Sequence, residues 1–426
     1  MKLKAVKTSA LLSLLFLVVY PTCNWITSLR SDVGTWYFEW ERHIPFVPIF
    51  IVPYMSIDLF FVAAPLLCSG DEERRTFARR MSFAIVAAGL CFLVFPLRFA
   101  FARPVVSGWL GTIFNTFRGF DRPYNLVPSL HITLRTILAD TYARHTRGAF
   151  RAVSHVWFSL IGLSTLLTYQ HHVVDVAGGF VLAAVCFYLF REAPTRLPLT
   201  VNKLVGTYYA AGGIACVVLA AACWPWGALL LWPAVALAIV AAAYVGMGPG
   251  IFRKRDGRLP LSTRLILGPV LAGQWLSLQY YRRQCHAWDE VAPRVWIGRK
   301  LNAHEAAEAA RCGVTAVLDL TAEFSEVRPF LGVGYCNLCV MDLTAPTQDQ
   351  LRRAVAFITE HTVQGIVYVH CKIGYSRSAA IVGAYLLASN RATSAEEAVA
   401  LMLTARPALI VRPEAMAALR NFAKTV

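Results

Sequence analysis

The chain has 426 residues, of which 57% are hydrophobic and 15% are charged, and its mean hydropathy is +0.51. This composition excludes an ordinary soluble protein and indicates several membrane spans. The formal net charge of +16 lies almost entirely in residues 1–284, which hold 27 Lys and Arg against 12 Asp and Glu. A basic excess in the apolar part suits cytosolic loops and gives no support to nucleic-acid binding.

Eight apolar segments are predicted to cross a membrane within residues 1–250. The first is the run from Ala10 to Tyr20, and the others lie near 45–68, 81–102, 128–143, 154–170, 173–190, 204–223 and 226–248. With the amino terminus inside, the cytosolic segments hold 18 Lys and Arg and the external loops hold six. This distribution follows the positive-inside rule and predicts an all-α polytopic bundle.

Polar side chains that suit acid–base chemistry are predicted to meet at the external membrane face. His171 and Asp175 are four residues apart, one helical turn, so the carboxylate can orient the imidazole. His131 can supply a proton to a leaving oxygen, and clustered arginines can neutralise a phosphate. The alternative is that these polar residues are simple interface anchors.

This pattern resembles the type-2 phosphatidic acid phosphatase superfamily over roughly residues 45–190. The family motifs are matched by Arg103-Pro104, by Pro128-Ser129-Leu130-His131, and by Ser164-Thr165 followed by His171 and Asp175. The resemblance implies that His171 is the nucleophile, Asp175 its partner and His131 the general acid.

Two departures from this family leave the reaction open. Pro96 stands where the first motif usually has a lysine, and the arginine of the third motif is missing. The remaining pattern is closer to the branch of sphingomyelin and inositol-phosphorylceramide synthases. A lipid phosphatase, a head-group phosphotransferase and a non-catalytic lipid-binding anchor therefore remain as alternatives. Arg98 and Arg135 are candidates for the missing positive charge, and an ion pair with Asp140 is the structural alternative for Arg135.

Residues 251–284 are expected to form a basic linker and an interfacial helix. The run 253–258 is strongly basic and should lie at the cytosolic surface. The segment from Leu265 to Tyr281 is apolar but interrupted by Gly268-Pro269. We interpret it as an interfacial helix with Trp275 near the head groups rather than a ninth span.

Residues 285–426 alternate strand and helix patterns, which predict a cytosolic α/β domain. Its central feature is the sequence from His370 to Ser378, which lies between an apolar strand and a helix. Such a loop favours a bound anion and an ionised thiol at Cys371. Arg377 can hold two phosphate oxygens, and Ser378 can donate a hydrogen bond to the sulfur as it leaves.

The loop resembles the His-Cys-five residues-Arg-Ser signature of the protein tyrosine phosphatase superfamily in its dual-specificity form. The resemblance covers nearly all of 290–426 and implies a general acid on an earlier loop. Asp342 is the favoured candidate, and Asp319, at the end of an apolar strand, is the alternative and is expected to be structural. Lys372 and Gly374 would contribute to substrate binding, and the pattern Cys-Lys-x-Gly-x-x-Arg resembles the lipid-directed members. Neither resemblance implies a cofactor or a metal.

The sequence thus predicts a membrane-bound bifunctional phosphatase with an external histidine site for lipid phosphates and a cytosolic cysteine site for phosphomonoesters. Its expected partners are membrane lipids and phosphorylated lipid or protein substrates. Because a thiolate persists in a reducing compartment, the carboxyl-terminal domain should be cytosolic. A bacterial cytoplasmic membrane is the expected location.

Overall fold

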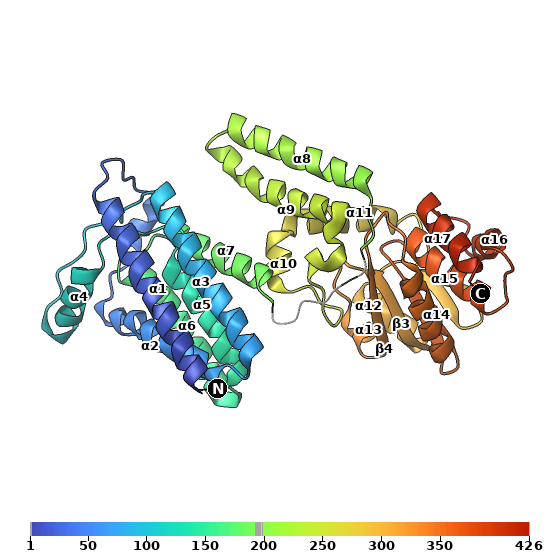
Figure 1. The fold of residues 1–426 in the computed structure, drawn as a ribbon, viewed down its shortest axis with the longest axis horizontal. Coiled ribbons are helices and arrows are strands. Elements are labelled where there is room, and N and C mark those ends of the chain that lie inside the picture. The colour runs from blue at the N-terminus through green and yellow to red at the C-terminus, as the bar shows by residue number, and fades with distance from the viewer. Residues whose placement is uncertain (1, 192–196, 198, 426) are drawn as a thin grey trace. The chain divides into compact units, whose positions relative to one another are not determined.

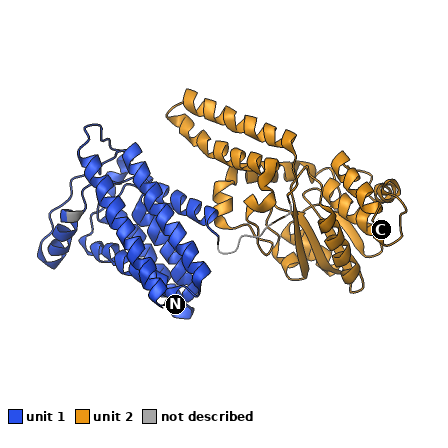
Figure 2. Cartoon of the chain, in the orientation of Figure 1, with its two compact units in different colours: residues 1–194 blue, residues 195–426 orange. Residues whose placement is uncertain are grey.

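The computed structural model describes residues 2–191, 197 and 199–425. The chain divides into two compact units, Met1–Pro194 and Thr195–Val426 (Figure 2). The expected domain boundaries at 250/251 and 284/285 both lie inside the second unit. The division into membrane part, linker and phosphatase domain stays a prediction.

The named elements of the first unit are all helices within its described residues. Its elements are α1 (Lys2–Ser28), η1 (Glu39–His43), η2 (Pro48–Phe50), α2 (Ile51–Leu67), α3 (Asp71–Val94), α4 (Gly108–Phe120), α5 (Leu130–His145), α6 (Gly148–Leu167) and α7 (Val173–Leu189). Helix α5 packs against α2, α3, α6 and α7. Gly179 permits the close approach of α7, because a Cβ there would lie 2.6 Å from the carbonyl oxygen of Ser129. This packing brings the start of α5 beside the start of α7.

Six helical segments in the described part of the chain are long and apolar enough to cross a membrane. They are Lys2–Ser28, Pro48–Leu67, Asp71–Val94, Gly148–Leu167, Lys203–Ala222 and Trp226–Met247. The two other expected spans correspond to α5 and α7, which have 16 and 17 residues and fall short of the usual length of a span. The apolar helices indicate association with a membrane, and the number of eight spans is not confirmed.

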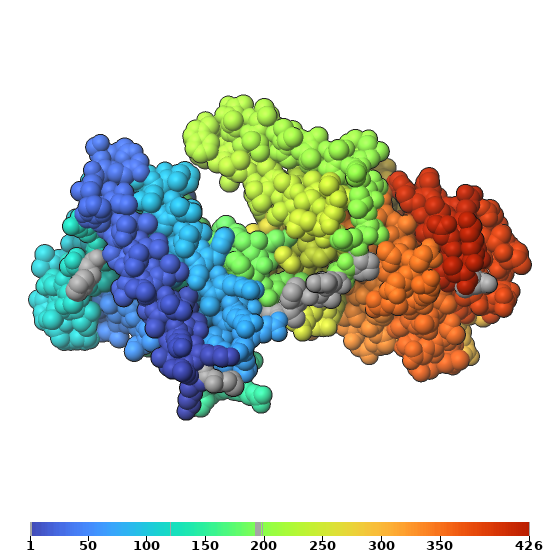
Figure 3. Space-filling view, viewed as in Figure 1, coloured from blue at the N-terminus to red at the C-terminus, as the bar shows by residue number. Residues whose placement is uncertain are grey.

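The second unit begins with a helical hairpin. It contains α8 (Lys203–Ala222), η3 (Trp226–Leu230), α9 (Leu231–Ala242), η4 (Ala243–Met247) and η5 (Pro249–Phe252), followed by α10 (Leu261–Ile266) and α11 (Gly268–Tyr281). Helices α8 and α9 pack side by side and project from the rest of the unit, as the ribbon and the space-filling view both show (Figures 1 and 3). The apolar side chains on the hairpin, such as Ile214 and Val218, are largely exposed.

The segment expected to form one interfacial helix is broken in two. Gly268 and Pro269 begin α11, because proline is tolerated in a first helical turn but not in a helix interior. With 14 residues, α11 is too short to cross a bilayer. It packs against α9, and its Trp275 is 54% exposed. These features agree with the interpretation of this segment as one that does not span.

A five-stranded mixed sheet and the helices that cover it form the rest of the second unit, which confirms the expected α/β domain. The strands are β1 (Trp288–Ala292), β2 (Val295–Gly298), β3 (Val314–Thr321), β4 (Gly334–Val340) and β5 (Ile366–His370), in the order β1-β2-β5-β3-β4. Only β1 pairs antiparallel. The helices are α12 (Ala303–Arg311), α13 (Arg328–Leu331), α14 (Gln348–Thr362), α15 (Ser376–Ala388), α16 (Ala395–Ala405) and α17 (Pro413–Ala423).

Two apolar clusters bury the two faces of this sheet. Helices α14 to α17 contribute to the larger cluster, and α12 and α13 contribute to the other. The central strand β5 is buried along nearly its whole length and ends at His370. The loop that follows therefore emerges at the carboxyl edge of the parallel strands, where ligands of α/β sheets usually bind.

Candidate active sites

The loop between β5 and α15 has the geometry of an anion-binding turn. Cys371 follows the last residue of β5 and is 4% exposed, and α15 begins five residues later at Ser376. Gly374 has a φ of 76°, and a Cβ at this position would overlap the backbone of Gly298. Only glycine fits both conditions, so the tight turn depends on this residue. The Ser378 side chain is fully buried in the first turn of α15.

Arg377 is held by acidic side chains on both sides of its guanidinium. Nη2 lies 2.9 Å from Glu323 Oε1 and 3.1 Å from Asp342 Oδ1, and Nη1 donates to the carbonyl oxygen of Val340 at 2.9 Å. Glu323 is buried and was not anticipated from the sequence. It fixes the plane of the guanidinium, which is the property needed for binding two oxygens of one phosphate.

The structure brings Asp342 to the loop between β5 and α15, where it contacts Lys372 and Arg377. Its Oδ2 accepts a hydrogen bond from Lys372 Nζ at 2.8 Å, and its Oδ1 faces Arg377. Burial alone would raise the pKa of Asp342, but Arg377 and Lys372 lower it to about 2. In the substrate-free protein this carboxyl group is therefore ionised at neutral pH.

Two basic residues of other elements hold the loop backbone. The amide nitrogen of Lys300 donates to the carbonyl oxygen of Lys372 at 3.0 Å. Arg406, which follows α16, donates to the carbonyl oxygen of Ile373 at 3.1 Å and forms an ion pair with Asp289. Arg406 is 2% exposed and lies 35 positions after Cys371, so no local motif points to it.

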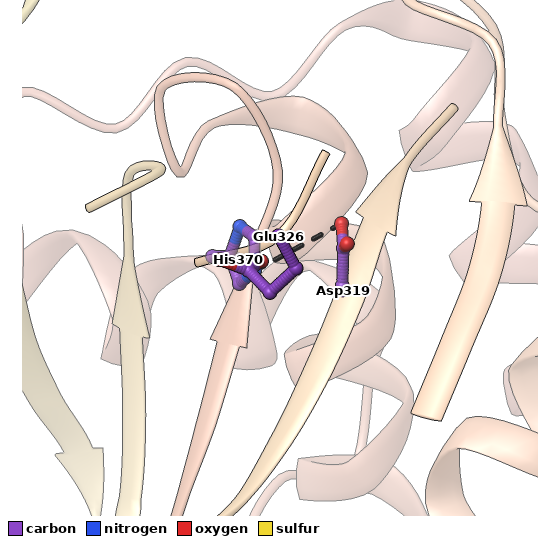
Figure 4. Close-up of side chains that lie close together, drawn as sticks. All are labelled: Asp319, Glu326 and His370. Atoms are coloured by element: carbon purple, nitrogen blue, oxygen red, sulfur yellow. Dashed lines mark ion pairs between the residues drawn. The ribbon is translucent and has the colours of Figure 1, made fainter. Parts of the chain in front are cut away.

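Behind the loop, Asp319, Glu326 and His370 form a buried cluster whose spacing would suit a metal ion (Figure 4). His370 Nε2 lies 2.9 Å from Glu326 Oε2. The two carboxylates already have cationic partners, since Lys254 Nζ lies 2.5 Å from Asp319 and Lys300 Nζ lies 3.0 Å from Glu326. The donor set is thus that of a charge-balanced ion-pair network rather than a vacant metal site.

Lys254 corrects one expectation about the linker. The basic run 253–258 was expected at the cytosolic surface, yet the Lys254 side chain is only 1% exposed. Its ammonium group enters the domain and also donates to the carbonyl oxygen of Thr321 at 2.8 Å. The sequence shows the positive charge of this residue but not the buried carboxylate that it meets 65 positions later.

The first unit contains a cavity of about 670 Å³ into which both predicted histidines project. His131, near the start of α5, stacks on Tyr54 with ring centroids 4.2 Å apart. His171 precedes α7, and its Nδ1 lies 3.4 Å from Asp175 Oδ2. His131, His171 and Asp175 are therefore brought together, as the sequence pattern implied.

The predicted arginines are placed less favourably for phosphate binding. Among the described residues that line the cavity there is no Lys or Arg, whereas Asp58 and Asp121 do line it. Arg135 donates from Nε to the carbonyl oxygen of Phe158 on α6. Asp140, the alternative partner of Arg135, instead forms ion pairs with Arg80 and Arg144.

The other two arginines belong to the segment between α3 and α4. Arg98 is exposed, and Arg103 is half-buried with an electrostatic influence on Asp121. The structure thus assembles the histidines and the aspartate without bringing Arg98 or Arg135 to the cavity wall.

Comparison with known proteins shows that the carboxyl-terminal part of the chain is similar to phosphatases of the dual-specificity type. Residues 295–425 match the family of the dual specificity phosphatase catalytic domain. The phosphatidylglycerophosphatase and protein-tyrosine phosphatase 1 of Homo sapiens is 40% identical over 98 residues, which cover 22% of this chain and 48% of that protein. Dual specificity protein phosphatase 26 of Homo sapiens is 29% identical over 161 residues, covering 34% of this chain and 76% of that protein.

One solved structure, PTPMT1 in complex with PI(5)P, is 25% identical, with a TM-score of 0.30, and covers 33% of this chain and 96% of that chain. This chain spans about half the length of the first curated relatives that it matches. The carboxyl-terminal part of the chain is a phosphatase domain of the dual-specificity type.

Proposed function

We propose that this domain is a cysteine-dependent phosphatase that hydrolyses phosphomonoesters at the loop from His370 to Ser378. The observation that carries the proposal is that Cys371 opens the loop leading into α15, where Arg377 lies in the first helical turn and faces Asp342. A helix amino terminus and a fixed guanidinium stabilise the negative charge that spreads over the phosphoryl oxygens during transfer.

The reaction follows from these positions in two steps. The Cys371 sulfur attacks phosphorus, so that a sulfur–phosphorus bond forms as the bond to the alcohol oxygen breaks, and Asp342 gives that oxygen a proton. Water then attacks the phosphocysteine and gives a proton to Asp342. Phosphate is released, and Cys371 leaves as a thiolate to which Ser378 donates a hydrogen bond.

This sequence requires Asp342 to gain a proton when the substrate binds. In the free protein Arg377 and Lys372 keep its pKa at about 2. A phosphate dianion that enters the loop pairs with Arg377 and adds negative charge beside the carboxyl group. Both changes raise the pKa of Asp342, so substrate binding itself prepares the acid.

We infer further that the substrates include lipid phosphomonoesters. One support is the human relative that is 40% identical over 98 residues, which is named as a phosphatidylglycerophosphatase as well as a protein-tyrosine phosphatase. The other is the apolar hairpin of α8 and α9, which belongs to the same compact unit as the phosphatase fold. A tether at the membrane concentrates lipid substrates near the site.

The test uses the full chain in detergent. In a His171→Ala background, an aryl phosphate and a short-chain lipid phosphate should both be hydrolysed, and Cys371→Ser should abolish both activities. Cys312→Ser, an exposed cysteine on the same domain, is the control and should leave both rates unchanged. Full activity of the Cys371→Ser protein would refute the assignment.

A second candidate function rests on the cavity of the first unit. His131 and His171 both line it, and Asp175 is placed to orient His171. We propose that His171 attacks a lipid phosphate to form a phosphohistidine, while His131 protonates the departing oxygen. Water as acceptor gives a phosphatase, and an alcohol gives a head-group transferase.

This site is tested in the Cys371→Ser background with labelled lipid phosphates. Release of phosphate, or transfer to an added alcohol, should disappear in His171→Ala. His155→Ala, on exposed surface of α6, is the matched control. If no lipid substrate yields either product, the membrane part is a non-catalytic anchor.

The location is also a proposal. We propose that the protein lies in a bacterial cytoplasmic membrane with its phosphatase domain in the cytosol, which the loop charges and the thiol nucleophile support. A reporter that works only in the cytosol should be active when fused after Val426. Activity of a reporter that works only outside the cell would reverse this orientation.

A further inference from the structure

Helix α11 lies outside the residues that match the phosphatase family, yet one of its side chains contacts the catalytic loop. Gln274 Oε1 accepts a hydrogen bond from Lys372 Nζ at 2.9 Å. The same ammonium group donates to Asp342 Oδ2 at 2.8 Å. Because a lysine carries three N–H donors, the described residues leave one of them for a ligand.

The amide nitrogen of Gln274 also has a partner, which fixes the orientation of the side chain. Nε2 donates to the hydroxyl oxygen of Tyr209 on α8 at 3.3 Å, and Tyr209 stacks on Tyr244 with ring centroids 5.5 Å apart. Tyr244 in turn donates to the backbone carbonyl oxygen of Asp342 at 2.8 Å. The contacts close into a ring that runs from Lys372 through Gln274, Tyr209 and Tyr244 to Asp342.

The two partners of Lys372 respond differently to the proposed reaction. When Asp342 acquires its proton, it loses the charge that attracts the ammonium group. Gln274 is neutral in every state, so its hydrogen bond to Lys372 persists. A lysine on a flexible four-carbon stem would otherwise lose its position over the loop at the moment when the substrate is bound.

We infer that Gln274 is a positioning residue that holds the Lys372 ammonium group over the mouth of the loop, where it meets a second anionic group of the substrate. This inference rests on the proposed function. Gln274 acts through Lys372 and does not touch the reacting atoms. Through this contact α11, which lies outside the residues that match the phosphatase family, takes part in substrate selection.

A purely structural role for Gln274, as an attachment of α11 to the domain, gives a different kinetic result. Looser attachment would lower the rate on every substrate by a similar factor. A positioning role would change the preference for substrates with a second negative group, mainly through KM. It would also make the effects of changing Gln274 and Lys372 non-additive, since one group acts through the other.

The experiment uses the full chain in detergent in a His171→Ala background. Two water-soluble aryl phosphates, with and without a second anionic substituent, are compared in Gln274→Leu, Lys372→Met and the double variant. We expect the preference in kcat/KM for the doubly anionic substrate to fall about tenfold in each single variant, which corresponds to about 1.4 kcal/mol. The double variant should show no further loss.

Gln279→Leu is the matched control, because Gln279 lies on the same helix and contacts Arg282 instead of the loop. In Gln279→Leu the preference in kcat/KM for the doubly anionic substrate should equal that of the parent protein. Equal losses on both substrates in Gln274→Leu, or additive effects in the double variant, would overturn the inference. Failure of the proposed function would show separately, as activity that survives Cys371→Ser.

Discussion

The buried ion pair between Lys254 and Asp319 offers a sharp test of how the linker is attached to the phosphatase fold. Lys254→Met keeps most of the side-chain volume and removes the charge. The four charged groups of the network, Lys254, Lys300, Asp319 and Glu326, sum to zero, so the variant leaves one carboxylate uncompensated in the interior. We expect a large loss of stability.

The contacts set the size of the loss. Breaking a buried pair by removing one partner costs about 3–5 kcal/mol. Asp319 retains hydrogen bonds from the amide and hydroxyl of Thr321 and from the hydroxyl of Tyr335, at 2.7 to 2.8 Å. These bonds place the cost near the lower end, about 3 kcal/mol, which for a unit of this size lowers the midpoint of unfolding by about 6–12 °C.

The assay is pulse proteolysis of the full chain in detergent at increasing temperature, followed through a carboxyl-terminal tag. The double variant Lys254→Met/Asp319→Asn restores charge balance and should recover more than half of the lost stability. Arg255→Met is the control, since Arg255 lies in the same linker but is 72% exposed. A loss below about 1 kcal/mol in Lys254→Met would refute the reasoning.

Three further predictions concern the cysteine site. Asp342→Asn should slow substrates with poor leaving groups by about 100-fold or more and activated aryl phosphates much less, measured as kcat across a leaving-group series. Lys372→Met removes a cation that lowers the pKa of Asp342, so the alkaline limb of the pH profile of kcat, which reports the substrate complex, should move to higher pH. An alkaline limb that stays in place or moves to lower pH would contradict the assignment. Gly374→Ala should lower kcat about 100-fold through displacement of the loop, and kcat within threefold of the parent would show that the turn tolerates a Cβ.

Much of the phosphatase fold was predictable because its signals are local. The strand β5 and the helix α15 lie on either side of the loop, as the apolar strand and helix patterns around it predicted. The edge strand β1 has a weak local signal, because its sequence Trp-Asp-Glu-Val-Ala mixes polar and apolar residues and the strand pairs along only one side.

The residues around the loop were predictable only in part. Cys371, Arg377 and Asp342 belong to short patterns that specify their surroundings. Glu323 and Gln274 do not, because their roles arise from tertiary contacts with residues 54 and 98 positions away. In the first unit, His131 and His171 belong to recognisable sequence motifs. Asp58 and Asp121, which also line the cavity, belong to no such motif.

The attachment of the α8–α9 hairpin to the phosphatase fold has a consequence for where the loop from His370 to Ser378 lies relative to a membrane. A helix of 20 residues such as α8 rises about 30 Å, which equals the thickness of a bilayer's hydrocarbon core. At the start of α8, Asn202 donates to the carbonyl oxygen of Leu343, the neighbour of Asp342. If α8 spans a membrane, we expect Asp342 to lie at the plane where acyl chains give way to head groups. In that case we expect the hairpin to set the distance from the bilayer at which a substrate phosphate can reach the loop.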